Sequence, residues 1–180
     1  MYTVALRCVE NNNSKMFSYI IKFLTPVELR KLLYECVTTS KHEFIDVIIQ
    51  STNVEPYNVA LFCLVTYATP TLEIFLSKYQ LNNRELNELA RLSLRSNDSY
   101  LINLLSKYVT DYERYAICAL CNRKFKLFKS IEDRVNIDLI MQYAETHNIS
   151  AESMIVLINR YELWKEKKRR RLKSTRCLLS

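Results

Sequence analysis

Apolar side chains recur along the chain with helical spacing, in short segments that polar breaks separate. In ALFCLVTYATPTLEIFLSKYQLN (60–82), one apolar run is followed by a polar break and then by a second apolar stripe. Residues 88–111 repeat this order, and both segments end the second stripe in Leu-Ser-Lys-Tyr. An i, i+3, i+4 spacing of apolar residues is typical of a helix with one buried face. Each segment therefore predicts two short helices joined by a turn.

The same pattern returns about every 28 residues, with further copies at 5–26, 31–53, 115–136 and 140–161. The first helices share small residues at related positions, namely Ala60, Ala90, Ala116, Ala144, Cys8, Cys36 and Cys63. The second helices share apolar pairs, namely Ile20-Ile21, Ile48-Ile49, Phe75-Leu76 and Leu104-Leu105. Because neither helix of a pair can bury its stripe alone, we expect about six helix pairs to stack into a solenoid over residues 1–163.

Residues that favour helix starts stand near the expected boundaries. Serine, asparagine and aspartate side chains accept hydrogen bonds from the free N–H groups of a first turn, and proline suits an early helical turn. The candidates are Ser40, Ser99 and Ser150 before second helices, Asn83 and Asp111 at first helices, and Pro70.

The composition strengthens the helical prediction. The chain has no glycine and only 3 prolines, while 49% of its residues are hydrophobic. The absence of glycine excludes the glycine-rich loops that cradle phosphates. It also removes the residue on which the positive-φ positions of tight hairpins depend. We therefore expect an all-α fold with a real core.

The repeated pattern, Ala-Leu-x-x-Ala/Cys, a polar break, Leu-x-x-Leu-Leu and an Asn/Asp turn, resembles the ankyrin repeat over about residues 3–161. The Thr-Pro-Leu-His tetrapeptide and the glycines are absent, and the period is shorter than the ankyrin period of about 33. The resemblance is to divergent, glycine-poor ankyrin-type proteins of large DNA viruses and of some intracellular bacteria. It implies a noncatalytic stack whose surface binds a protein partner, which it does not identify.

The positive charge is confined to one end of the chain. Residues 1–163 hold 18 Lys/Arg and 18 Asp/Glu, whereas residues 164–180 hold eight basic residues and one acid, Glu166. A neutral body with a basic tail, here residues 164–180, differs from the basic body typical of a nucleic-acid groove. We therefore divide the chain into a helical domain at 1–163 and a polybasic tail at 164–180.

The tail ends in Cys177-Leu178-Leu179-Ser180, which fits the C-a-a-X box for prenylation, with the terminal serine favouring farnesyl. A prenyltransferase is then a partner of the tail. One prenyl chain anchors weakly, so a second signal is needed, and basic residues near an anionic leaflet provide one. The candidates are Lys165, Lys167, Lys168, Arg169, Arg170, Arg171, Lys173 and Arg176. These features predict a location at the cytoplasmic face of a membrane.

The same basic run supports a second interpretation. Lys167 to Arg171 fits a nuclear-import signal or a nonspecific nucleic-acid patch. The alternative function is therefore a nuclear or nucleic-acid-associated binding protein. The neutral body and the neighbouring Cys177 favour the membrane.

Residues for catalysis or metal binding are sparse, so we expect no enzyme, no cofactor and no metal site. Cys118 and Cys121 lack a second Cys/His pair at ligand spacing. The two histidines, His42 and His147, have no evident nucleophile partner, and His147 is expected at a helix end. The start has no signal-peptide pattern, so the cysteines are expected to be reduced.

Tyrosines recur at the ends of the units, and two roles remain open for them. They can be half-buried edges of the stack with the hydroxyl toward water, or anchors for a protein partner. The set is Tyr57, Tyr67, Tyr79, Tyr100, Tyr108, Tyr112 and Tyr115.

Overall fold

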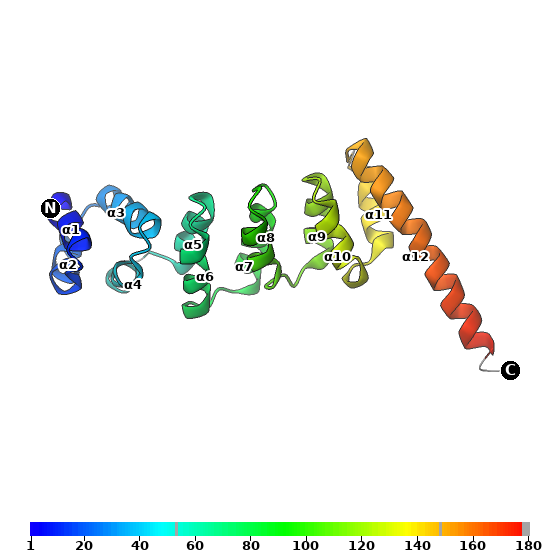
Figure 1. The fold of residues 1–180 in the computed structure, drawn as a ribbon, viewed down its shortest axis with the longest axis horizontal. Coiled ribbons are helices and arrows are strands. Elements are labelled where there is room, and N and C mark those ends of the chain that lie inside the picture. The colour runs from blue at the N-terminus through cyan, green and yellow to red at the C-terminus, as the bar shows by residue number, and fades with distance from the viewer. Residues whose placement is uncertain (53, 148, 178–180) are drawn as a thin grey trace.

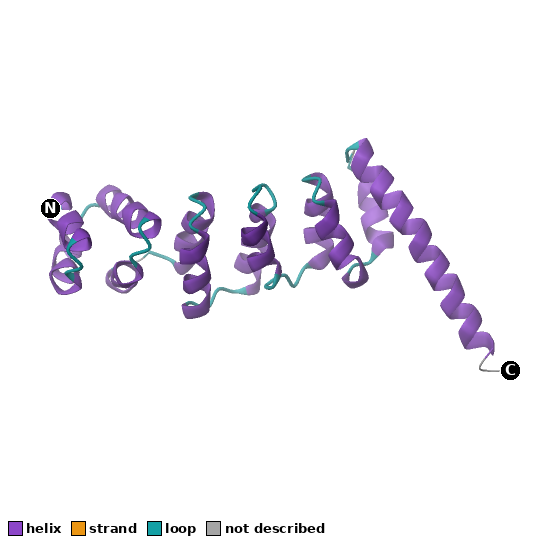
Figure 2. Ribbon diagram, in the orientation of Figure 1, coloured by secondary structure: helices purple, strands orange, loops and turns teal. Residues whose placement is uncertain are grey.

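The computed structural model describes residues 1–52, 54–147 and 149–177, without the side chains of Lys168 and of residues 171–177. Within these residues the chain forms twelve α-helices and two 3-10 helices, and it contains no strand (Figure 2). The predicted all-α fold class is confirmed.

The α-helices follow one another as six pairs, and each pair is joined by a short turn (Figure 1). Their bounds are α1 Tyr2–Glu10, α2 Ser14–Ile20, α3 Pro26–Thr38, α4 His42–Ser51, α5 Pro56–Val65, α6 Thr69–Lys78, α7 Asn83–Ser93, α8 Ser99–Ser106, α9 Tyr112–Cys121, α10 Phe125–Ile131, α11 Ile137–Thr146 and α12 Ala151–Cys177. The 3-10 helices Ile21–Phe23 and Glu132–Arg134 extend α2 and α10.

The pairs lie in a row along the longest axis of the molecule, with the two termini at opposite ends (Figure 1). First helices of successive pairs are in contact, as α5 with α7, α7 with α9, and α9 with α11. Second helices also meet, as α2 with α4 and α6 with α8. Each described pair therefore buries its apolar stripes partly within itself and partly against a neighbour.

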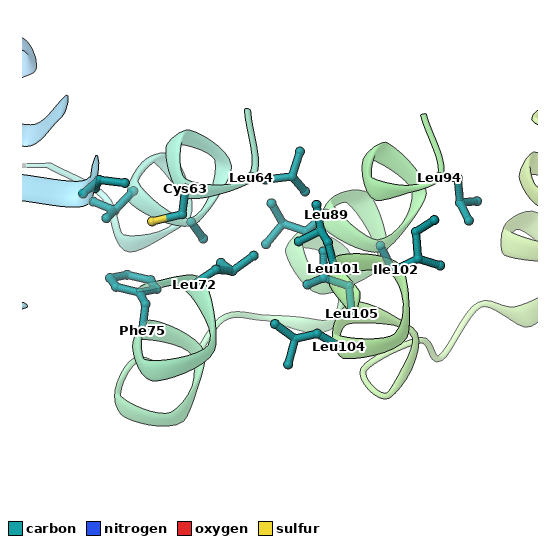
Figure 3. Close-up of a cluster of buried hydrophobic side chains, with 14 of the residues drawn as sticks. Cys63, Leu64, Leu72, Phe75, Leu89, Leu94, Leu101, Ile102, Leu104 and Leu105 are labelled. Atoms are coloured by element: carbon teal, nitrogen blue, oxygen red, sulfur yellow. The ribbon is translucent and has the colours of Figure 1, made fainter. Parts of the chain in front are cut away.

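Apolar side chains fill the space between neighbouring pairs. Figure 3 shows Leu64 and Leu72 of the third pair facing Leu89, Leu101 and Leu104 of the fourth, and all five are buried. A helical stripe that would be exposed on a lone pair is thus removed from water by the next one. The core consequently runs along the row, and the apolar positions recognised in the sequence supply it.

The small residues repeated in the first helices are buried, as their periodicity predicts. Ala60 and Ala90, together with Cys36 and Cys63, have 0% exposed surface. Burial raises the pKa of the Cys36 and Cys63 thiols to about 12. Both thiols therefore remain protonated at neutral pH and act as small apolar groups in the core.

Four turns within pairs contain a positive φ, although the chain has no glycine: Asn12 (52°), Ser40 (55°), Tyr67 (56°) and Arg123 (56°). The assumption that a glycine-free chain lacks such positions is therefore wrong. At Tyr67, the N–H of the following Ala68 donates to the Cys63 carbonyl oxygen at 2.9 Å. This is the hydrogen bond of a Schellman motif, and it holds the left-handed conformation without glycine.

The helix-start residues are partly as predicted. Asp111 accepts a hydrogen bond from the Arg114 N–H at 3.1 Å, and Pro70 lies in the first turn of α6. Ser99 and Asn83 are instead the first helical residues, because the preceding Asp98 and Asn82 act as the caps. Ser150 is as predicted, because its hydroxyl oxygen accepts a hydrogen bond from the Ser153 N–H at the start of α12, whereas Ser40 lies in the positive-φ turn.

Replacing Tyr67 with glycine is expected to raise the free energy of unfolding by about 0.5–1 kcal/mol. A left-handed conformation costs a residue with a Cβ about 1–2 kcal/mol, and the added freedom of glycine in the unfolded chain offsets part of this gain. Tyr67 is 63% exposed, so truncation of its side chain removes little packing. Urea denaturation measures the change. Tyr67→Val should destabilise the protein, because a β-branched side chain disfavours this conformation further, and an equal effect of both substitutions would contradict the argument.

Candidate binding surfaces and C-terminal tail

Residues 164–177 of the predicted basic tail belong to one continuous helix of 27 residues, α12, which also provides the second helix of the last pair. At 1.5 Å per residue this helix is about 40 Å long. Its first half packs on α11, and its second half extends past the row of pairs (Figure 1). The boundary predicted between residues 163 and 164 thus falls inside α12.

Polar and aromatic contacts fix the first half of α12. The Ser153 hydroxyl donates to the Leu120 carbonyl oxygen at 2.7 Å. The Arg160 Nε lies 3.3 Å from Glu132 Oε2, and both side chains are mostly buried, with 23% and 17% exposed. Trp164 is partly buried against the core. The helix is therefore held by the body up to the point where its basic residues begin.

The described basic side chains in the second half of α12 lie on more than one side of the helix. Lys167, Arg169 and Arg170 are exposed, and Arg170 has a weak i, i+4 partner in Glu166 at 3.8 Å. Because successive helical residues are rotated by about 100°, Lys167, Arg169 and Arg170 lie on different sides of the axis. The side chains of Lys168, Arg171, Lys173, Arg176 and Cys177 are not described, and Leu178-Leu179-Ser180 lies outside the described residues.

The cysteines and histidines considered for catalysis or metal binding lie on α4, on α9 and directly after α11. Burial raises the pKa of the Cys118 thiol, while Cys121 is exposed one turn later on α9. His147 follows the end of α11, where its ring stacks on Tyr143 with centroids 3.9 Å apart, and His42 is half-buried at the start of α4. Within the described part of the chain, no cluster of three or more His, Cys, Asp or Glu side chains could hold a metal ion.

Side-chain hydrogen bonds that the apolar pattern does not predict connect successive pairs. The Thr71 hydroxyl donates to the Val37 carbonyl oxygen at 3.2 Å, and three pairs later the Ser153 hydroxyl donates to the Leu120 carbonyl oxygen in the same way. Thr71 also lies 3.2 Å from the Ser40 hydroxyl. At these two positions, a small hydroxyl residue in the first turn of a second helix satisfies a carbonyl group near the end of the first helix of the preceding pair. The sequence feature that indicates these hydrogen bonds is a threonine or serine at the third position of a second helix, as at Thr71 and Ser153.

Two tyrosine hydroxyls form hydrogen bonds between neighbouring pairs. The Tyr79 hydroxyl donates to Asp46 at 2.6 Å, and the Tyr100 hydroxyl donates to Glu73 at 2.5 Å. Burial, and then the hydrogen bond to Asp46, raises the pKa of Tyr79 to about 12. Tyr115 is buried, whereas Tyr67 is exposed. For Tyr79 and Tyr100 the first of the two roles therefore needs correction, because their hydroxyls bind carboxylates of the preceding pair.

Two large surface hollows lie between helix pairs. One, of about 490 Å³, is lined mainly by apolar residues of α3, α4 and α5, among them Leu29, Leu33 and Phe62. The other, of about 620 Å³, lies between α8 and α10 and combines apolar residues with three cations. These hollows are two of the concave surfaces that could receive another molecule.

Comparison with known proteins adds no relative: no family model, no curated protein and no solved structure matches the chain. In the part of the chain that the structure describes, no helix has the length and apolar character required to span a membrane. Arguments about function therefore depend on the residues themselves.

Proposed function

We propose that the chain is a noncatalytic adaptor, in which stacked ankyrin-like helix pairs bind a protein partner and a farnesylated Cys177 anchors them at the cytoplasmic face of a membrane. The row of six pairs, with the same small residues buried in successive first helices, supports the repeat architecture. Contacts between successive first helices and hydrogen bonds between pairs, such as Thr71 to Val37, are those expected of a stack in which each unit contacts only its neighbours.

The observation that carries the membrane anchor is the basic second half of α12. Residues 1–163 carry equal numbers of acidic and basic groups, so the uncompensated charge of +7 lies on this helix. Each cation near an anionic leaflet contributes about 1 kcal/mol, which complements the weak anchoring of one prenyl chain. The helix extends beyond α11 (Figure 1), and its basic end can therefore approach a flat surface without the body.

The resemblance to viral and bacterial ankyrin-type proteins extends the proposal to interference with host signalling or defence. In that setting a host prenyltransferase modifies Cys177. The second candidate function is a nuclear or nucleic-acid-associated binder, which the exposed cations Lys167, Arg169 and Arg170 favour. Their exposure on different sides of a helix suits an import receptor or a phosphate backbone as well as a lipid surface.

Replacing Cys177 with serine is expected to release the full-length protein from membranes in eukaryotic cells. Without the thiol, no prenyl chain can be attached, and the basic helix alone gives reversible binding. A fluorescent protein fused to the amino terminus reports the location, and intact mass reports a farnesyl adduct with loss of the last three residues. Cys121→Ser, at an exposed cysteine of the body, is the matched control and should stay at the membrane. An unmodified mass with the same location for both variants would refute the anchor and favour the nuclear alternative.

A further inference from the structure

The hollow between α8 and α10 has an apolar floor and a basic rim. Its volume is about 620 Å³, and Ile102, Phe125 and Leu127 are its apolar lining residues. Arg123, Lys124 and Lys126 are its charged lining residues, and no carboxylate lines it. On the other side of α8, the second helices α6 and α8 are in contact.

One of the cations is held in place by the fold. The Lys124 ammonium donates to the Ser96 carbonyl oxygen at 2.9 Å and lies 3.5 Å from Asn97 Oδ1. Both acceptors belong to the turn between α7 and α8, so Lys124 bridges the two sides of the hollow at this end. A charge that is already ordered loses less conformational entropy when a ligand binds.

A second hollow on the other side of α10 continues the same surface. It measures about 450 Å³ and shares Phe125 and Lys126 with the first, while Lys129 and residues of α12 such as Leu163 complete it. The two hollows therefore flank one helix, and Phe125 lines both. An extended segment of a partner could cross α10 and contact α8 and α12 at once.

The charge of this surface is strongly one-sided. Residues 120–131 contain Arg123, Lys124, Lys126 and Lys129 and no acidic residue, although residues 1–163 as a whole are neutral. Within the described residues, neither Lys126 nor Lys129 has an acidic partner. Arg123 pairs with Glu152 at 3.4 Å, with more than 60% of both side chains exposed, and such a pair contributes little and is easily exchanged.

We propose that α10 is the docking site for an acidic peptide segment of a partner protein, whose bulky apolar side chain enters the hollow between α8 and α10. The four cations match carboxylates of the segment, and charge complementarity of this kind guides specific association. The apolar floor favours a peptide over a nucleic-acid backbone or a lipid headgroup, which have no aliphatic or aromatic side chain to place there. This inference rests on the proposed adaptor function, for which it supplies a site and a partner chemistry, and it is independent of the tail.

The test uses a fluorescein-labelled peptide of glutamates around a central Leu-Phe pair. The protein is the full chain in which Lys167, Lys168, Arg169, Arg170 and Arg171 are replaced by glutamine, because the tail would itself attract an acidic peptide. Fluorescence anisotropy should show salt-dependent binding, and Lys126→Glu/Lys129→Glu should weaken it at least about tenfold, as expected when charge-assisted contacts become repulsive. Lys31→Glu/Lys107→Glu, at exposed lysines of α3 and at the end of α8, is the matched control and should leave binding unchanged.

Two further measurements test whether the peptide binds at this hollow through its apolar side chains. A photoreactive benzoylphenylalanine in place of the peptide phenylalanine should attach to α8 or α10, as located by mass spectrometry, and a peptide with serine in place of Leu-Phe should bind at least about tenfold more weakly. Equal weakening by both charge pairs, attachment elsewhere, or full competition by phosphatidylserine vesicles or duplex DNA would overturn the docking site. None of these outcomes affects the location of the Cys177→Ser variant, so failure of this site and failure of the membrane anchor are distinguishable.

Discussion

Replacing Leu105 with alanine is expected to lower the free energy of unfolding by about 2–5 kcal/mol, because it removes a buried side chain and leaves a cavity. Leu105 has 0% exposed surface, and it lies on α8 with its side chain in the cluster that joins the third and fourth pairs (Figure 3). It shares a register with the half-buried Leu76 and Ile49 of earlier second helices. Urea denaturation followed by circular dichroism measures the loss.

The matched control is Arg95→Ala in the turn between α7 and α8, where the side chain is exposed. This change is expected to cost less than about 0.5 kcal/mol, as is usual for surface substitutions. In a chain whose units contact only their neighbours, a defect in the middle can also separate the unfolding of the two halves. A second transition in Leu105→Ala alone would agree with this. Comparable losses at Leu105 and Arg95 would contradict the packing of the row.

Removing five cations of α12 is expected to weaken binding of the unlipidated protein to anionic vesicles by about three to four orders of magnitude. Lys167, Lys168, Arg169, Arg170 and Arg171 each contribute about 1 kcal/mol near such a surface, and about 1.4 kcal/mol corresponds to a factor of ten. Because the attraction is screened over about 8 Å at physiological ionic strength, added salt should weaken wild-type binding and barely change that of the glutamine variant. Vesicle sedimentation measures both.

The control for this prediction is a second variant with five glutamines, placed in the body at the exposed residues Lys15, Lys22, Arg30, Lys31 and Lys107. It has the same net charge as the tail variant, and it should bind vesicles nearly as well as the wild type if position on α12 matters. The helical signal should be unchanged in both. A preference of the unlipidated wild type for particular duplex DNA sequences over anionic vesicles would argue against the membrane and for the nuclear alternative.

The sequence predicted the features that depend on local spacing. The apolar stripes of segments such as 60–82 predicted two helices with a turn, and α5 and α6 occupy this segment. Ala60, Ala90 and Cys63 could be recognised as buried because a short side chain at a fixed interval indicates close packing of helices. The concentration of charge after residue 163 also required only counting.

Helix ends were less predictable, because several nearby residues can cap the same turn. Asp98 precedes Ser99 and accepts hydrogen bonds from the N–H groups of Tyr100 and Leu101 at 2.9 and 3.1 Å. The sequence offered both Asp98 and Ser99, and only the backbone conformation decides between them. The same applies to the left-handed Tyr67, whose residue type gives no indication of a positive φ, since the hydrogen bond from Ala68 to Cys63 imposes it.

By itself, the sequence determined the all-α class, the pairing of the helices and the uneven distribution of charge, because periodicity and composition are properties of neighbouring residues. Only the tertiary structure decided which groups meet across pairs, such as Thr71 with Val37, Tyr79 with Asp46 and Lys124 with Ser96, which are separated by 34, 33 and 28 residues. It also decided where adjacent helices leave a hollow beside Phe125. These contacts depend on how each pair is rotated against the next, and that rotation results from the packing of whole side-chain surfaces, which no local spacing encodes.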